Sequence, residues 1–238
     1  MNNTVELIGH YGGDEAHALS AWTSTSRELT EGKSQRIGKL LKMLASAGHH
    51  TPFEKSSLHF LVSTDIATHI QLLKHRIGVS INAESARYKE LKEDKYYIPD
   101  DWGETPSSDC IMTPGISNNP LNNYESEDFS EEGEDWLTIL ERYTILGNRL
   151  YHQCIADLEP VLGRKRAKES ARFFKTYNSQ ITADVMFNFR SFIHFLNLRN
   201  KPDAQLEIQE LSGIMLELVK NIEGNPFKLT LEAFDVDR

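Results

Sequence analysis

The sequence has few cysteines and no long apolar run. Its two cysteines, Cys110 and Cys154, cannot build a disulfide framework, and no cysteine or histidine spacing typical of a metal site occurs. No apolar stretch approaches the roughly 20 residues that a membrane-spanning helix needs. The first residues lack both the charged and the apolar region of a signal peptide. We therefore expect a soluble, cytoplasmic protein without a bound metal.

The common motifs of nucleotide binding and nucleophilic catalysis are also missing. The sequence contains no GxGxxG, no GxxxxGK[ST] and no GxSxG. Neither cysteine has the electropositive surroundings of a reactive thiolate, which favours two inert thiols. His49 and His50 have no nearby partner with metal-ligand spacing. A dinucleotide fingerprint, a P-loop and a serine or cysteine nucleophile are thus not indicated.

Positive charge is scarce and locally concentrated. The chain has 26 Lys and Arg against 35 Asp and Glu, a net charge of -9, which argues against a general nucleic-acid or membrane-surface binder. Yet residues 74–90, KHRIGVSINAESARYKE, gather Lys74, His75, Arg76 and Arg87. Cations at a helix C-terminus are favoured by about 0.3–1 kcal/mol. The other interpretation is a site for a confined anion, because arginine pairs bidentately with phosphate.

Hydrophobic periodicity predicts the secondary structure. Alternation predicts strands over residues 56–63 and 181–189, and residues 4–11 are interpreted as a first strand that ends at a glycine pair. The 3.6-residue period predicts helices over 14–30, 34–48, 63–76, 134–158 and 202–222.

Finer expectations concern single side chains. Ser34 should cap its helix, with Gly48 at the C-terminal end. Pro202 should lie in the first turn of the last helix. The alternation through residues 181–189 should place Asn188 and Arg190 on the polar face of a strand. Two helices should bury apolar stripes, formed by Ile66, Ile70 and Leu73 and by Trp136, Ile139, Tyr143, Leu146 and Leu150. The last helix should pack through a third stripe, formed by Ala204, Ile208, Leu211, Met215, Leu218 and Ile222.

These elements interleave along the chain. They predict an α+β fold in which an antiparallel or mixed sheet is flanked by helices, in a single domain over residues 1–238. A segment at about 104–134 is rich in Pro, Ser, Asn and Gly and then strongly acidic, so we interpret it as a surface-loop insertion.

Five segments in order together resemble the flavin-dependent thymidylate synthases. They are HHTPFEK, QLLKHR, SINAESARY, NFRSFIHFLNLR and AQLEIQ, which extend from His49 to about Glu207. The sequence departs from the family pattern at three places. Lys74 replaces the first arginine of R-H-R, eight residues instead of seven separate Arg76 from Ser85, and Ala83 stands where an acidic residue is expected, with Glu84 one step later.

The resemblance implies an activity and its cofactors. The family performs the reductive methylation of dUMP to dTMP, with methylenetetrahydrofolate as the carbon donor and NADPH, through FAD, as the reductant. It implies a single catalytic domain and a homotetramer whose sites are shared between subunits, with no nucleic-acid or membrane partner.

The resemblance also implies roles for individual residues. The catalytic positions would be Arg199 and Ser85. The flavin would be bound by His49, Thr51, Lys74, His75, Arg76, Glu84, Asn188, Arg190 and His194. Bound dUMP would meet Gln71, Lys74, Glu84, Ser85, Ala86, Arg87, Arg172 and Arg199. Tyr88 would lie near the folate or the nicotinamide.

Two other functions stay open at this point. The departures at Lys74 and Ala83 are compatible with a non-catalytic nucleotide- or RNA-binding protein that retains the basic loop. A nucleotide-binding phosphotransferase or hydrolase is disfavoured because the sequence has neither a P-loop nor clustered metal-binding carboxylates.

Overall fold

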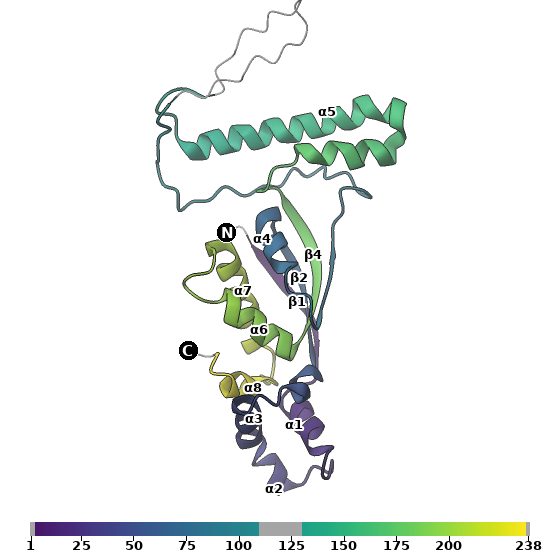
Figure 1. The fold of residues 1–238 in the computed structure, drawn as a ribbon, viewed down its shortest axis with the longest axis vertical. Helices are drawn as coiled ribbons and strands as arrows, with labels where there is room; N and C mark the ends of the chain where they lie inside the picture. Colours follow the sequence, from purple (N-terminus) through teal and green to yellow (C-terminus); the bar gives the residue numbers. More distant parts are fainter. Residues whose placement is uncertain (1–2, 110–129, 237–238) are drawn as a thin grey trace, which may run out of the picture. The chain divides into compact units, whose positions relative to one another are not determined.

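The computed structural model describes residues 3–109 and 130–236, which form two compact units (Figure 1). The sheet unit comprises Met1–Glu84 and Gln180–Arg238, and the helical unit comprises Ser85–Ser179. Cys110 and much of the predicted insertion at 104–134 lie outside the described residues. The single domain expected from the sequence stays a prediction. No helix among the described residues is both long and apolar enough to cross a membrane.

A four-stranded antiparallel sheet organises the sheet unit. Its strand order is β1(Thr4–Tyr11), β2(Ser57–Asp65), β4(Gln180–Asn188) and β3(Val79–Ala83). Phe60 of β2 and Ile81 of β3 both pair with Val185 of β4. The prediction of an antiparallel α+β fold is confirmed. The sequence did not predict β3, a strand of five residues at the sheet edge.

One face of the sheet is buried under helices. Leu58, Phe60 and Val62 of β2 are fully buried and, like Val185 and Phe187 of β4, belong to the main core cluster. The helices α6(Phe189–Arg199) and α7(Leu206–Lys220) lie side by side against this face (Figure 1). Each fully buried side chain of this size contributes about 1.5–3 kcal/mol, so the alternation in β2 and β4 determines which face carries the core.

The remaining helices of the sheet unit are short. They are α1(Asp14–Trp22), α2(Glu31–Ser34), α3(Ile37–Ser46), η1(Thr51–Glu54), α4(Ile66–Leu72) and α8(Lys228–Ala233). The first and third bury a second, smaller core around Leu41 and Phe53.

The region between α1 and α3 differs from the prediction. The helix predicted over 14–30 ends at Trp22, where the hydroxyls of Thr23 and Ser24 bond back to carbonyls one turn earlier. Such bonds compete with helical ones and favour termination. Ser34 ends α2 and does not cap α3, so that prediction was wrong. Gly48 does follow α3 in a left-handed conformation, with φ 72°, as predicted.

The predicted inner stripe of α4 was wrong. Ile70 and Leu73 are 37% and 43% exposed, whereas His69 and Leu72 are buried. The reason is the start of the helix. The Asp65 carboxylate accepts a hydrogen bond from the Thr68 backbone N–H at 2.8 Å, which starts α4 at Ile66 and sets its rotation.

The end of one predicted strand and the start of one predicted helix also differ, and the sequence did not predict α6. Asn188 ends β4 and caps α6, because its Oδ1 accepts the backbone N–H of Ser191 at 2.8 Å. Arg190 therefore lies in the first turn of α6 and not on a strand face. Pro202 precedes α7, which begins at Leu206. The apolar stripe predicted for α7 is confirmed at Ile208, Leu211 and Met215, which are buried.

The helical unit is built on one long helix, α5(Trp136–Ala171), followed by η2(Arg172–Phe174). Gly163 interrupts α5 with a non-helical φ of 75°. The stripe predicted for this helix is confirmed only at Ile139, which is buried. Trp136, Tyr143, Leu146 and Leu150 are between 37% and 55% exposed in this chain. The buried side chains of α5 instead include Tyr151 and Ile155.

A buried chain of hydrogen bonds joins the N-terminal part of the sheet unit to its C-terminal part. Ser56 Oγ donates to His17 Nε2 at 2.6 Å, and His17 Nδ1 donates to Thr230 Oγ1 at 2.9 Å. Thr230 in turn donates to Asp14 Oδ1 at 2.6 Å. Burial lowers the pKa of His17 to about 4, so the ring is neutral in the folded protein at neutral pH.

This buried histidine predicts an acid-dependent stability. His17 has a folded pKa of about 4 against an ordinary value of 6.5, so its contribution is complete above 6.5 and is lost as the pH falls toward 4. The difference in unfolding free energy between wild type and His17→Gln should therefore decrease by about 2 kcal/mol between about pH 7 and about pH 5. Urea unfolding at both pH values measures it. The exposed His10→Gln is the control, and an unchanged difference would contradict the assignment.

Candidate functional site

The junction between β4 and α6 fixes the loop that follows α4. The Asn188 backbone N–H donates to the Gly78 carbonyl at 2.8 Å, and Ser191 Oγ donates to the Ile77 carbonyl at 2.6 Å. Gly78 has φ 65° and lies so close that a Cβ there would collide with the side chains of Asn188 and Ser191. We call these four residues the strand–helix junction. It holds the end of the Lys74–Gly78 loop against the start of α6.

Arg199, at the end of α6, makes two hydrogen bonds to the end of α4 and the loop after it. Its Nε donates to His75 Nε2 at 3.2 Å, and a terminal nitrogen donates to Gln71 Oε1 at 3.2 Å. Gln71 also donates to Gln205, just before α7. We call Gln71, His75, Arg199 and Gln205 the Arg199 network. It brings together three predicted site residues that are up to 128 positions apart.

The Arg199 network leaves a cation without a carboxylate partner. Burial, reinforced by the charges of Arg199 and His194, lowers the pKa of His75 to about 4. His75 is therefore neutral near neutral pH, and its Nε2 accepts the hydrogen bond from Arg199. Gln71 is neutral too, so both hydrogen-bond partners that Arg199 has among the described residues are uncharged and neither neutralises the guanidinium. Such a cation can stabilise negative charge on a ligand.

A pocket of about 460 Å³ lies beside this network. Its wall is partly apolar, from Ile77, Ile193 and Phe234, and partly polar, from Arg190 and His194. The His194 ring centroid is 6.2 Å from that of His75, so the two histidines connect the pocket to the network. The volume falls within the range of small-molecule pockets, about 300–1,000 Å³. An apolar wall with a few polar side chains suits a flat ligand that has a polar edge.

The other residues of the sheet unit that were predicted to bind the flavin do not line the first pocket. His49 and Thr51 line a second pocket of about 510 Å³, which shares His50 with the first. Lys74 and Arg76 are exposed on either side of buried His75. Glu84 Oε2 accepts the backbone N–H of Thr182 at 3.0 Å, so this carboxylate extends the pairing of β3 with β4.

Four predicted residues belong to the helical unit: Ser85, Ala86, Arg87 and Arg172. The Ser85 carbonyl accepts the backbone N–H groups of Tyr88 and Lys89, both at 3.0 Å, which forms a tight turn. Arg87 Nε donates to Glu169 Oε1 at 3.1 Å. Arg172 is exposed in η2. These four residues belong to the helical unit, whereas the Arg199 network belongs to the sheet unit.

The prediction missed several side chains that line the first pocket. Glu54 forms an ion pair with Arg190, and His50, Asn197 and Phe234 complete the wall. Glu54 and Asn197 lie within the segments HHTPFEK and NFRSFIHFLNLR, so those segments could have indicated them. Phe234 carries no such signal. Among residues 3–109 and 130–236, no cluster of three His, Cys, Asp or Glu side chains could hold a metal ion.

The fold and the site together define an α+β protein in which the Arg199 network lies beside a pocket of about 460 Å³. The family model of the thymidylate synthase complementing proteins matches residues 6–223. The chain therefore belongs to this family.

Individual relatives are similar over most of their length. A flavin-dependent thymidylate synthase of Kosmotoga olearia is 29% identical, over 97% of this chain and 89% of its own. One from Tropheryma whipplei is 30% identical, over 82% of this chain and 75% of its own. Among solved structures, the UMP/dUMP methylase PolB from Streptomyces cacaoi bound with 5-Br dUMP has a TM-score of 0.68 and 26% identity, covering 99% of this chain and 95% of that one.

The strand–helix junction predicts that Gly78 cannot carry a side chain. Gly78→Ala should cost about 1–2 kcal/mol for the left-handed backbone, plus about 1–3 kcal/mol for the collision with Asn188 and Ser191. Gly224→Ala is the matched control, because Gly224 has φ 73° and open space around it. Chemical denaturation measures both variants. Equal losses of stability would show that the close approach at Gly78 has no energetic consequence.

Proposed function

We propose that this chain is a flavin-dependent thymidylate synthase that converts dUMP to dTMP. The observation that carries the proposal is the Arg199 network, where a cation without a carboxylate partner is held by residues of the family's own motifs. The names of the relatives from Kosmotoga olearia and Tropheryma whipplei support the activity, and the 5-Br dUMP bound to PolB supports the substrate class.

Arg199 is the residue we assign to the uracil ring. Its hydrogen bonds to His75 and Gln71 hold the guanidinium in one place before the substrate binds. A fixed cation favours the ionised form of the uracil, in which the ring is the nucleophile, and it costs little reorganisation during the reaction. The protein thereby needs no thiolate, which agrees with the absence of a reactive cysteine setting at Cys154, a half-buried residue on α5.

The phosphate of dUMP is assigned to the turn at Ser85–Arg87 together with Arg172. Arg87 uses Nε for Glu169, which leaves its two terminal nitrogens for a phosphate. The Ser85 hydroxyl and the Ala86 backbone N–H would donate further hydrogen bonds to the phosphate at the same turn. Gln71, Lys74 and Glu84 complete the set of side chains that we assign to dUMP.

The residues around the 460 Å³ pocket fit a flavin, which we take to be FAD. The apolar wall suits a flat ring, and Arg190 and His194 line the same pocket. We assign these two residues, with Asn188 and His75, to the polar edge of the ring. His49, Thr51, Lys74 and Arg76 would bind the rest of the cofactor. When bound, the flavin supplies the reducing equivalents of the reaction. The chain's part is to bind and orient it and to exclude water.

The co-substrates and the assembly complete the proposal. NADPH would supply electrons and methylenetetrahydrofolate the carbon, with Tyr88 near one of them.

Tyr143, Leu146 and Leu150 recur at helical spacing on α5 and are 55%, 37% and 41% exposed, which supports burial against another copy of the chain. We propose a homotetramer with shared sites. A cytoplasmic location stays a prediction from the sequence.

Arg199→Ala should separate cofactor binding from turnover. The variant should retain FAD absorbance because the pocket wall does not include Arg199, while dTMP formation should fall by about a hundredfold or more, the usual effect of removing a polarising group. Arg149→Ala, an exposed arginine on α5, is the charge-matched control. Near-normal turnover of Arg199→Ala would remove this residue from its assigned role.

Arg87→Ala should weaken the binding of dUMP far more than that of FAD. Losing a charge-assisted phosphate contact costs about 1.5–3 kcal/mol, roughly tenfold to a hundredfold in affinity. Calorimetry with each ligand measures it. Glu169→Gln, which leaves Arg87 in place, should have a smaller effect. An unchanged dUMP affinity in Arg87→Ala would contradict the phosphate assignment.

Reconstitution tests the function as a whole. Purified protein should acquire flavin absorbance with added FAD and form dTMP only when dUMP, NADPH and methylenetetrahydrofolate are all present. Protein that stays colourless with FAD, yet binds dUMP or RNA, would instead favour a non-catalytic binding protein.

A further inference from the structure

The segment Ser85–Asp94 carries the proposed phosphate turn and contains no helix or strand. Its position depends on side-chain contacts with α5. Lys168 Nζ donates to the Tyr88 carbonyl at 2.7 Å, and the Leu91 backbone N–H donates to the hydroxyl of fully buried Tyr151 at 3.1 Å. Since loops without regular hydrogen bonding are held mainly by such contacts, each of them affects where the turn lies.

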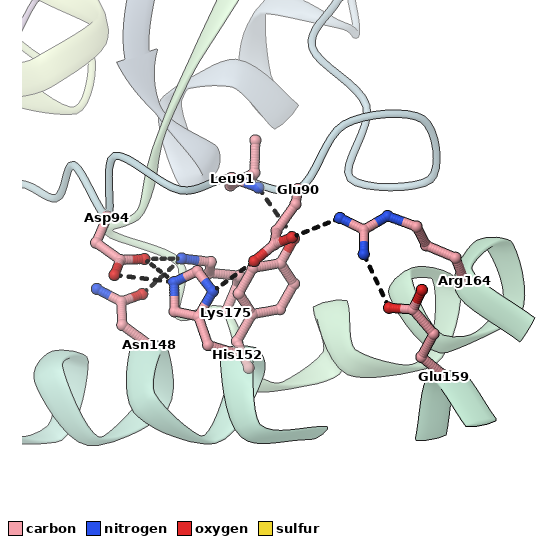
Figure 2. Close-up of polar contacts among 9 residues, drawn as sticks. Glu90, Leu91, Asp94, Asn148, His152, Glu159, Arg164 and Lys175 are labelled. Carbon is pink, nitrogen blue, oxygen red and sulfur yellow. Dashed lines mark hydrogen bonds and ion pairs between the residues drawn. The ribbon is translucent and has the colours of Figure 1, made fainter. Parts of the chain in front are cut away.

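His152 joins two points of this segment to α5. Its Nδ1 lies 3.0 Å from Glu90 Oε1, and its Nε2 lies 3.0 Å from Asp94 Oδ2 (Figure 2). Carboxylates only accept hydrogen bonds, so the doubly protonated ring satisfies both partners at once, whereas a neutral ring can donate to one. We call His152, Glu90 and Asp94 the His152 bridge.

Other charges surround the His152 bridge on both sides. Arg164 pairs with Glu90 at 3.2 Å, and Lys175 Nζ donates to Asp94 at 2.7 Å and to Asn148 at 2.7 Å (Figure 2). Desolvation raises the pKa of Asp94, but hydrogen bonds from Lys175 and His152 outweigh it and leave this pKa below its ordinary value. Asp94 also has a left-handed φ of 47°, an uncommon conformation that these contacts hold in place.

We propose that His152 is a positioning residue for nucleotide binding: it fixes the segment after the Ser85–Arg87 turn on α5, and so sets where the phosphate-binding donors lie. Glu90 is only three residues beyond Arg87, so a displacement at Glu90 is transmitted to the guanidinium. The Arg87–Glu169 contact at 3.1 Å is a second link from the same turn to the same helix. This inference rests on the proposed binding of dUMP at that turn.

The first test compares kinetic parameters. His152→Ala should raise the KM for dUMP by about tenfold or more, because displaced binding groups are costly, while kcat changes less than about threefold and the flavin absorbance is retained. His152→Gln keeps one amide donor and should be intermediate. Gln153→Ala is the matched control, since Gln153 is the next residue of α5 and its side chain donates a hydrogen bond to Asp157 on the same helix. A KM for dUMP that equals the wild-type value in His152→Ala would overturn the inference.

The second test does not depend on turnover. Amide hydrogen exchange over residues 88–94, without nucleotide, should be faster in His152→Ala than in wild type and unchanged in Gln153→Ala. If wild type does not bind dUMP, the proposed function fails, and exchange still decides whether His152 holds the segment. If His152→Ala does not fold, Glu90→Gln provides the same comparison. Equal loss of dUMP affinity, FAD binding and kcat would show a merely structural role and overturn the inference.

Discussion

The hydrogen bonds between Gly78, Ile77, Asn188 and Ser191 are the constraint on which the sheet unit's site depends. They join the loop after α4 to the first turn of α6, and they require a residue without a side chain at Gly78. Because the end of the loop is held against the start of α6, residues of both line the first pocket: Ile77 from the loop and Ile193 and His194 from the helix. The polar groups of the site are thus positioned by backbone geometry before any ligand binds.

Desolvation then decides the charge state of that site. His75 is buried beside a guanidinium, and both effects keep its ring neutral. A neutral His75 can accept the hydrogen bond that orients Arg199, whereas a charged ring would repel it. Within residues 3–109 and 130–236, Arg199 has no carboxylate partner, in contrast to Arg87, whose Nε is paired with Glu169. This difference is the basis on which we propose Arg199 for a ring with developing negative charge and Arg87 for a phosphate.

The sequence predicted the elements whose pattern is local. Alternation in β2 and β4 predicted their buried faces, and ordered motifs indicated the residues that meet in the Arg199 network. The sequence-based prediction failed where tertiary contacts or helix caps determine the boundaries and the buried faces of an element. Asn188 converts the end of a strand into the start of a helix, which moved Arg190 off the predicted strand face. The apolar stripe of α5 was predicted to be buried but is mostly exposed in this chain. Periodicity identifies an apolar face of a helix, but it does not identify what covers that face. Phe234 and His152 carried no local signal.

The central claim is that this chain activates C5 of dUMP with a fixed arginine and a flavin, without a cysteine nucleophile. Release of tritium from 5-tritiated dUMP tests it most directly, because replacement of the C5 hydrogen must accompany methylation. With FAD, NADPH and methylenetetrahydrofolate present, the account predicts sustained release in wild type that stops when the flavin is removed. No release from flavin-loaded, dUMP-binding protein, or release that continues without flavin, would contradict it.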